Sequence, residues 1–67
     1  MIFIIDPDTG KSLFEIDDIE FLTTLEEPEE GVFEFRVYLK DGRKVPFRFN
    51  RRTAAEKLFH EIYRQLL

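Results

Sequence analysis

The 67-residue chain has no cysteine and no tryptophan, a single histidine, three glycines and three prolines. Without cysteine there is no disulfide bridge and no thiolate metal ligand, and one histidine is too few for a structural zinc site. No apolar run approaches membrane-spanning length, and no basic segment precedes the apolar residues at the start. We expect a cytoplasmic single domain over residues 1–67, with no cofactor and no membrane contact.

Charge is distributed unevenly along the chain. Residues 1–34 hold eleven acidic side chains and one basic one, net −10, whereas residues 35–67 hold nine basic and three acidic ones, net +6. The overall charge is −4. The interpretation that we favour is that the two halves attract each other in the fold. The other interpretation is a bipolar surface with a basic binding patch.

The clearest structural pattern lies in residues 32–39 and 44–49. Apolar side chains occupy every second position, which is typical of strands with one buried and one solvated face. A three-residue loop, residues 40–42, with Gly42 in the left-handed region brings both apolar rows to the same side. This antiparallel register pairs Val37 with Val45, Phe35 with Phe47, and Phe33 with Phe49.

Residues 1–5 and 12–17 form a second predicted hairpin around a Pro- and Gly-containing turn. Placing Ile4 opposite Phe14 gives one apolar row. A second apolar row then lies on the opposite face: Phe3, Ile5 and Leu13. The hairpin is therefore apolar on both sides, which predicts either cover on both sides or an exposed sticky patch.

The middle of the chain is less regular. The apolar row changes parity at residues 17–18, which predicts a bulge or a bend. Residues 19–25 alternate as a strand that places Phe21 opposite Val37, but residues 18–26 also fit a short helix, and we favour the strand. The four glutamates, the proline and the glycine of residues 26–31 predict a surface loop.

After residue 50 the apolar period becomes helical. A single stripe recurs at three- and four-residue steps: Ala55, Leu58, Phe59, Ile62 and Leu66. Thr53 and Glu56 have the spacing of a capping box, with Asn50 as an alternative cap. We predict a helix over residues 51–66 and an α+β fold: a four-stranded antiparallel meander (ββββα) with this helix packed on one face.

No residue pattern points to catalysis. His60 lies beside the apolar stripe with no nucleophile near it in the sequence, so a surface position on the helix is expected. The prediction is therefore a non-enzymatic domain. A candidate binding surface combines exposed apolar and basic residues: Leu22, Arg36, Tyr38, Lys44, Pro46, Arg48, Arg51 and Arg52.

Two kinds of partner fit that surface. The first is a protein partner, or a second copy of the chain, bound through an apolar sheet face. The second is nucleic acid, or a nucleic-acid-binding protein, bound through the basic C-terminal half. In that alternative the chain is a small natural bacterial or phage regulatory protein. Glu20 and Glu34 share the predicted surface and the sequence pI is about 4.9, which disfavours direct nucleic-acid binding.

The chain resembles de novo designed α+β mini-proteins. The resemblance covers the whole chain and consists of idealised connections, such as Asp-Pro-Asp-Thr-Gly-Lys and Lys-Asp-Gly-Arg, between alternating strands, followed by a terminal helix. It implies a scaffold or binder with no cofactor and no reaction. Two features depart from what such designs contain. Arg51 and Arg52 lie at a helix N-terminus, where the dipole disfavours cations, and the first hairpin is apolar on both sides.

Overall fold

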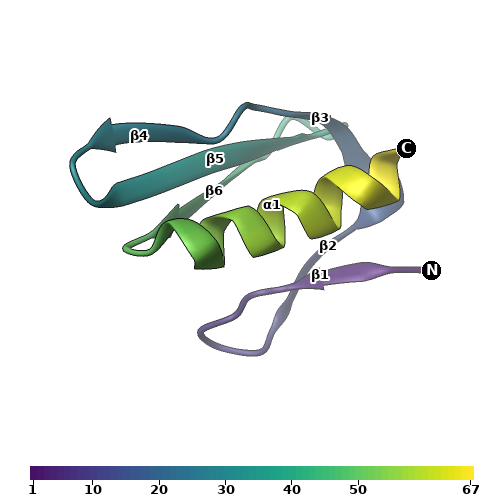
Figure 1. Ribbon diagram of the computed structural model, residues 1–67. Helices are drawn as coiled ribbons and strands as arrows, with labels where there is room; N and C mark the ends of the chain where they lie inside the picture. The colour runs from purple at the N-terminus through teal and green to yellow at the C-terminus, as the bar shows by residue number, and fades with distance from the viewer.

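The computed structural model describes residues 1–67 and has two layers (Figure 1). One layer is a four-stranded antiparallel sheet, and the other holds the single helix α1, Arg52–Leu66, beside a two-stranded hairpin. The α+β class, the antiparallel pairing and the C-terminal helix agree with the prediction. The four-stranded meander is matched only in part, because six strands are divided between two sheets.

The central hairpin has the predicted register. It consists of β5, Val32–Leu39, and β6, Lys44–Phe49. Gly42 has a φ of 93°, its N–H donates to the Leu39 carbonyl at 3.0 Å, and the Leu39 N–H donates to the Arg43 carbonyl at 2.9 Å. This closed loop aligns the apolar rows of the two strands: Val37 with Val45, Phe35 with Phe47, and Phe33 with Phe49.

The other edge of β5 is occupied by an interrupted strand. β3, Ile19–Leu22, pairs with the end of β5, and β4, Glu26–Glu29, pairs with its beginning. Between them the Thr23 N–H donates to the Arg36 carbonyl at 2.9 Å, and the Thr23 hydroxyl accepts the Arg36 N–H at 2.8 Å. The strand predicted for residues 19–25 is therefore present in its first part, and the helix alternative is wrong.

The register predicted for Phe21 is wrong. The β3–β5 pairing shifts after Ile19, so that Phe21 lies opposite Tyr38 instead of Val37. Phe21 is 51% exposed, whereas Leu22 is half-buried and packs against the core. A shift of one residue moves a side chain to the other face of the sheet, and the sequence has an apolar residue at both positions.

The surface loop predicted for residues 26–31 is wrong for most of its length. Glu26 pairs with Glu34 and Glu29 pairs with Val32, with an irregularity between the two pairs. All four side chains of β4 are exposed. Backbone groups at the edge of β5 need hydrogen-bond partners, and this requirement outweighs the low strand propensity of glutamate and proline.

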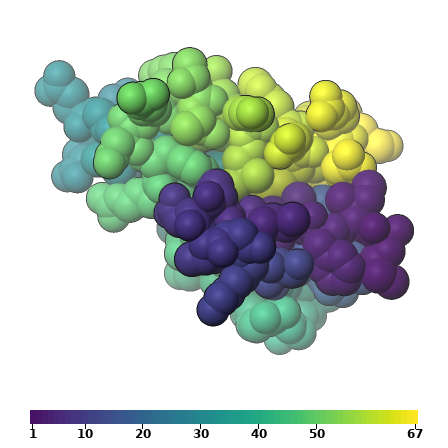
Figure 2. All heavy atoms as spheres, turned by 90° about the horizontal axis from the view of Figure 1, so that it is seen from below, coloured from purple at the N-terminus to yellow at the C-terminus, as the bar shows by residue number.

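The first hairpin forms a separate sheet of β1, Phe3–Ile5, and β2, Ser12–Glu15. Ile4 lies opposite Phe14 as predicted, and the Phe14 ring packs edge-on against a phenylalanine ring of β6. The bend expected at residues 17–18 is the 3₁₀ turn η1, Ile16–Asp18. The hairpin therefore covers the same face of the large sheet as α1, and the two lie side by side (Figure 2).

Helix α1 begins at Arg52, whereas a capping box of Thr53 and Glu56 requires Thr53 to precede the first helical residue. Its N-cap is Arg51, which makes no side-chain cap bond, so the predicted box is wrong. The apolar stripe faces the sheet, with Ala55 and Ile62 fully buried. Nine buried side chains form the core cluster: Ile4, Phe14, Ile16, Ile19, Phe35, Val37, Leu39, Phe47 and Ile62.

Candidate binding surface

The face of the large sheet opposite α1 carries no covering element. The ring centroids of Phe35 and of Phe59 on α1 are 5.3 Å apart, and those of Phe47 and Phe14 are 6.3 Å apart. The helix and the first hairpin therefore both lie on the side of the sheet to which the odd-numbered side chains of β5 and β6 point. Alternation sends the even-numbered side chains the other way. We call the uncovered surface the helix-free face, and its members are Phe21, Glu34, Arg36, Tyr38, Lys44, Pro46 and Arg48.

A stacked aromatic pair stands on the helix-free face. The Phe21 and Tyr38 rings have centroids 4.5 Å apart and an interplanar angle of 17°. The register shift of β3 brings them together, because it places Phe21 directly opposite Tyr38. Such pairs contribute about 0.5–1.5 kcal/mol beyond their burial. The pair is thus a half-exposed aromatic anchor on a face whose other side chains are mostly charged.

Two cations lie next to this pair without an anionic partner. Lys44 is opposite Tyr38 and Arg36 is opposite Pro46, and neither cation takes part in an ion pair within the chain. Arg48, further along β6, is 3.5 Å from a Glu29 carboxylate oxygen. The helix-free face is therefore basic and aromatic near the β5–β6 turn.

The opposite end of the helix-free face is acidic. Glu34 lies between Glu26 of β4 and Arg48 of β6 in the strand register. Glu29 forms an ion pair with Arg48, and all four side chains of β4 are exposed. Charge thus changes sign along the length of β5.

Arg51 and Arg52 do not belong to the helix-free face. The Arg52 guanidinium lies 5.0 Å from the centroid of the Phe33 ring and within 3.5 Å of a Glu27 carboxylate oxygen. It is also 3.7 Å from Glu56 one turn along α1. These contacts connect the start of the helix to the β4–β5 hairpin, so Arg52 has partners within the chain.

Of the eight residues predicted from the sequence, the structure gathers five on one surface. Leu22 packs against the core instead, and the two arginines lie at the helix start on the other side of the sheet. The five that share the helix-free face are Arg36, Tyr38, Lys44, Pro46 and Arg48. The sequence analysis did not assign Phe21 to this surface. Pairing Phe21 with the aromatic Tyr38, instead of with Val37, would have placed it there.

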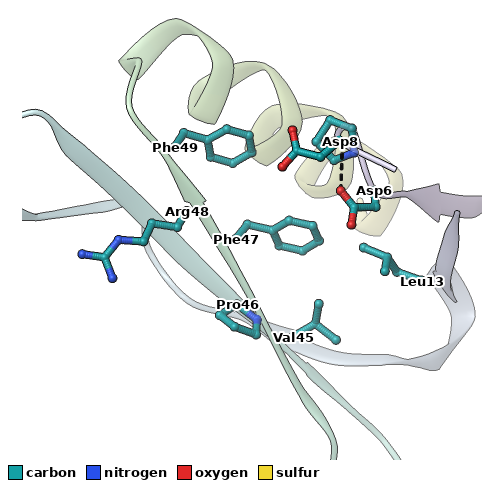
Figure 3. Close-up of a pocket in the computed structure, with 9 residues that line it drawn as sticks. Asp6, Asp8, Leu13, Val45, Pro46, Phe47, Arg48 and Phe49 are labelled. Atoms are coloured by element: carbon teal, nitrogen blue, oxygen red, sulfur yellow. Dashed lines mark hydrogen bonds between the residues drawn. The ribbon is translucent and has the colours of Figure 1, made fainter. Parts of the chain in front are cut away.

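A shallow pocket of about 200 Å³ lies between the first hairpin and β6 (Figure 3). Asp6 and Asp8 border it, and the Phe47 and Phe49 rings point toward it from the strand. The Asp8 N–H donates to Asp6 Oδ1 at 2.9 Å, so this carboxylate serves the turn itself. The Arg48 side chain points away from the pocket.

The remaining titratable groups include no cluster of metal ligands. No three side chains among His, Asp and Glu come together as metal ligands, and no buried side-chain polar atom lacks a hydrogen bond. His60 is exposed, as predicted, with its ring against Phe59. The pKa of Asp41 is lowered, first by the Arg43 backbone N–H at 2.9 Å and then by the Arg43 side chain at 2.7 Å.

Comparison of the chain with models of protein families, with curated proteins and with solved structures finds no match. The fold contains one α-helix, and it lacks the length and apolar character needed to cross a bilayer. Function is therefore inferred from the geometry of the surface.

Proposed function

We propose that the protein is a non-enzymatic protein-binding module that engages its partner through the helix-free face. The observation that carries the proposal is the stacked Phe21–Tyr38 pair, held on an uncovered sheet beside Arg36 and Lys44, neither of which has an anionic partner. Aromatic residues and arginine are the types that dominate binding energy at protein interfaces. Pro46 adds a rigid apolar contact next to Arg36.

The charges specify the partner's chemistry. An apolar side chain placed against the Phe21 ring, with carboxylates reaching Arg36 and Lys44, satisfies both features at once. The eight residues of β5 span about 26 Å, and three strands span about 10–14 Å, which gives several hundred Å². This is below the roughly 800 Å² per partner of stable complexes, so the interaction is a transient one.

Nucleic acid is the second candidate, supported by the cations and aromatic rings on one sheet face. Three observations favour a protein instead. Phe21 and Tyr38 stack on each other, which removes one face of each ring from base stacking. Glu29 pairs with Arg48, and Glu34 lies beside Arg48 in the register, so the phosphate backbone would meet carboxylates along the same face.

The test is affinity capture with matched variants. The wild-type chain, a Phe21→Ala/Tyr38→Ala double variant and Tyr63→Ala are immobilised and exposed to cell extract with and without nuclease. Tyr63 is the control, because it is 49% exposed but lies on α1.

A protein retained by wild type and by Tyr63→Ala, lost by the double variant and indifferent to nuclease is the expected result. Equal capture by all three chains contradicts the proposal. Capture that disappears with nuclease and falls steeply with salt supports the nucleic-acid candidate instead.

A further inference from the structure

The first hairpin, residues 1–15, is joined to the rest of the molecule without polar bonds. Its strands β1 and β2 pair only with each other, whereas β5 is hydrogen-bonded to β3, β4 and β6. None of the turn, loop and side-chain hydrogen bonds links residues 1–15 to residues 19–67, and none of the four ion pairs does so. Apolar packing therefore holds the hairpin in place.

That packing depends on few side chains. Ile4 and Phe14 are the buried residues of the hairpin, Leu13 is half-buried, and Phe3 and Ile5 are 47% and 52% exposed. All three hollows of the molecule border the hairpin, with volumes of about 200, 260 and 270 Å³. They separate its turn from β6 and its first strand from α1, along which it lies (Figure 2). Side chains that line a hollow lose the dispersion contacts that a filled interface supplies.

The turn η1 marks the boundary between the hairpin and the sheet. On its hairpin side, the Ile16 N–H donates to the Ile2 carbonyl at 2.9 Å. On its other side, the Lys40 N–H donates to the Asp18 carbonyl at 2.9 Å, which fixes the end of η1 to the β5–β6 loop. A movement of the hairpin therefore has its hinge within Ile16–Asp18.

We propose that the first hairpin is a lid, which leaves the core as one unit while the large sheet and α1 stay folded. Segments with few buried contacts open at a lower free energy than the rest of a protein. A two-stranded hairpin is marginally stable in water, so the detached lid also loses its own backbone hydrogen bonds.

Opening uncovers the helix side of β6. In the closed state the Phe14 ring packs edge-on against Phe47, and Pro7 and Leu13 lie across the pocket toward which Phe47 and Phe49 point (Figure 3). The open state therefore presents an apolar surface that the closed state hides. The helix-free face lies on the opposite side of the sheet and is the same in both states, so the lid is independent of the proposed binding surface.

Hydrogen exchange of the folded chain, followed by nuclear magnetic resonance in urea concentrations below the unfolding transition, tests the lid. The hairpin amides are expected to exchange about tenfold or more faster than those of the β5–β6 ladder, after correction for intrinsic rates. Their opening should share one urea dependence, smaller than that of the ladder but greater than zero, because opening exposes part of the buried surface.

Two conservative core variants separate lid opening from global unfolding. Phe33 is buried on β5 against the Arg52 guanidinium and lies outside the core cluster that contains Ile4. Ile4→Val is expected to speed exchange of hairpin and ladder amides by the same factor, about 2–10-fold, because the open and unfolded states both lack the Ile4 contacts. Phe33→Leu should speed exchange of the ladder amides only, because its contacts persist when the lid is open.

Equal protection and equal urea dependence of the hairpin and the ladder would overturn the proposal, since the hairpin would then open only when the whole chain unfolds. Faster exchange of the hairpin amides in Phe33→Leu would lead to the same conclusion. Hairpin exchange that does not depend on urea would reduce the lid to fraying of single residues.

Discussion

At the scale of single residues, Gly42 carries the conformational requirement of the central hairpin. Its φ of 93° lies in the region that side chains rarely adopt, and a Cβ built there meets nothing within 4 Å. The cost of a substitution is therefore one of backbone conformation. Gly42→Val is expected to lower the free energy of unfolding by about 1–2 kcal/mol, measured by urea denaturation.

Gly42→Asn is the matched control, because asparagine tolerates the left-handed region better than valine does. It is expected to cost less than Gly42→Val. Equal stability of the valine variant and wild type would mean that the loop does not depend on this conformation.

Asp41 makes the same loop sensitive to pH. The Arg43 backbone N–H and guanidinium hold the pKa of Asp41 below its usual value, so the ionised carboxylate stabilises the folded loop. That contribution is present above the unfolded-state pKa of about 3.9 and is lost as pH falls through the lower folded-state pKa.

The expected outcome is a stability difference between wild type and Asp41→Asn that is largest near neutral pH and shrinks toward pH of about 2–3. Urea denaturation of both chains across this range measures it, since the other carboxylates contribute equally to each chain. If the stability difference between wild type and Asp41→Asn grew as the pH fell, the ionised carboxylate would not be the stabilising form.

At the scale of elements, α1 closes the core through Ile62. This side chain is fully buried in the core cluster, whereas Leu66 on the same stripe is 41% exposed. Ile62→Ala is expected to cost about 2–5 kcal/mol, which is comparable to the total stability of a domain of this size. The variant should be largely unfolded by circular dichroism, while Leu66→Ala stays folded.

Periodicity predicted the elements in which each position had one clear preference. From Phe33 to Leu39 in β5 and from Val45 to Phe49 in β6, the core-facing apolar residues are separated by a charged residue, tyrosine or proline, and the register follows from the loop length. In β3 the adjacent Phe21 and Leu22 are both apolar, so alternation cannot say which faces the core. β4 was missed because its pairing is set by the backbone groups of β5 and not by its own side chains.

The register also determined which of the candidate binding residues share one face. The five that do so all lie on β5 and β6, where the predicted register was correct. Arg52 was misplaced because its contacts with Glu27 and Phe33 depend on how the helix start meets the β4–β5 hairpin. No local pattern in the sequence encodes that contact.

At the scale of the whole molecule, the two oppositely charged halves meet at two of the four ion pairs, Arg48–Glu29 and Arg52–Glu27. All of these side chains are 38–66% exposed, so each pair contributes about 1 kcal/mol or less. Attraction between the halves is therefore weak. Arg36 and Lys44 remain without an anion, as the proposed binding face requires.

The central claim concerns the two faces of β5, one sealed by α1 and the other left for a partner. Nuclear Overhauser spectroscopy on the folded chain tests it without knowledge of any partner. The account predicts cross-peaks between the Phe21 and Tyr38 rings and between the Phe35 and Phe59 rings, with none between Tyr38 and α1. Cross-peaks from Tyr38 to the helix would contradict it.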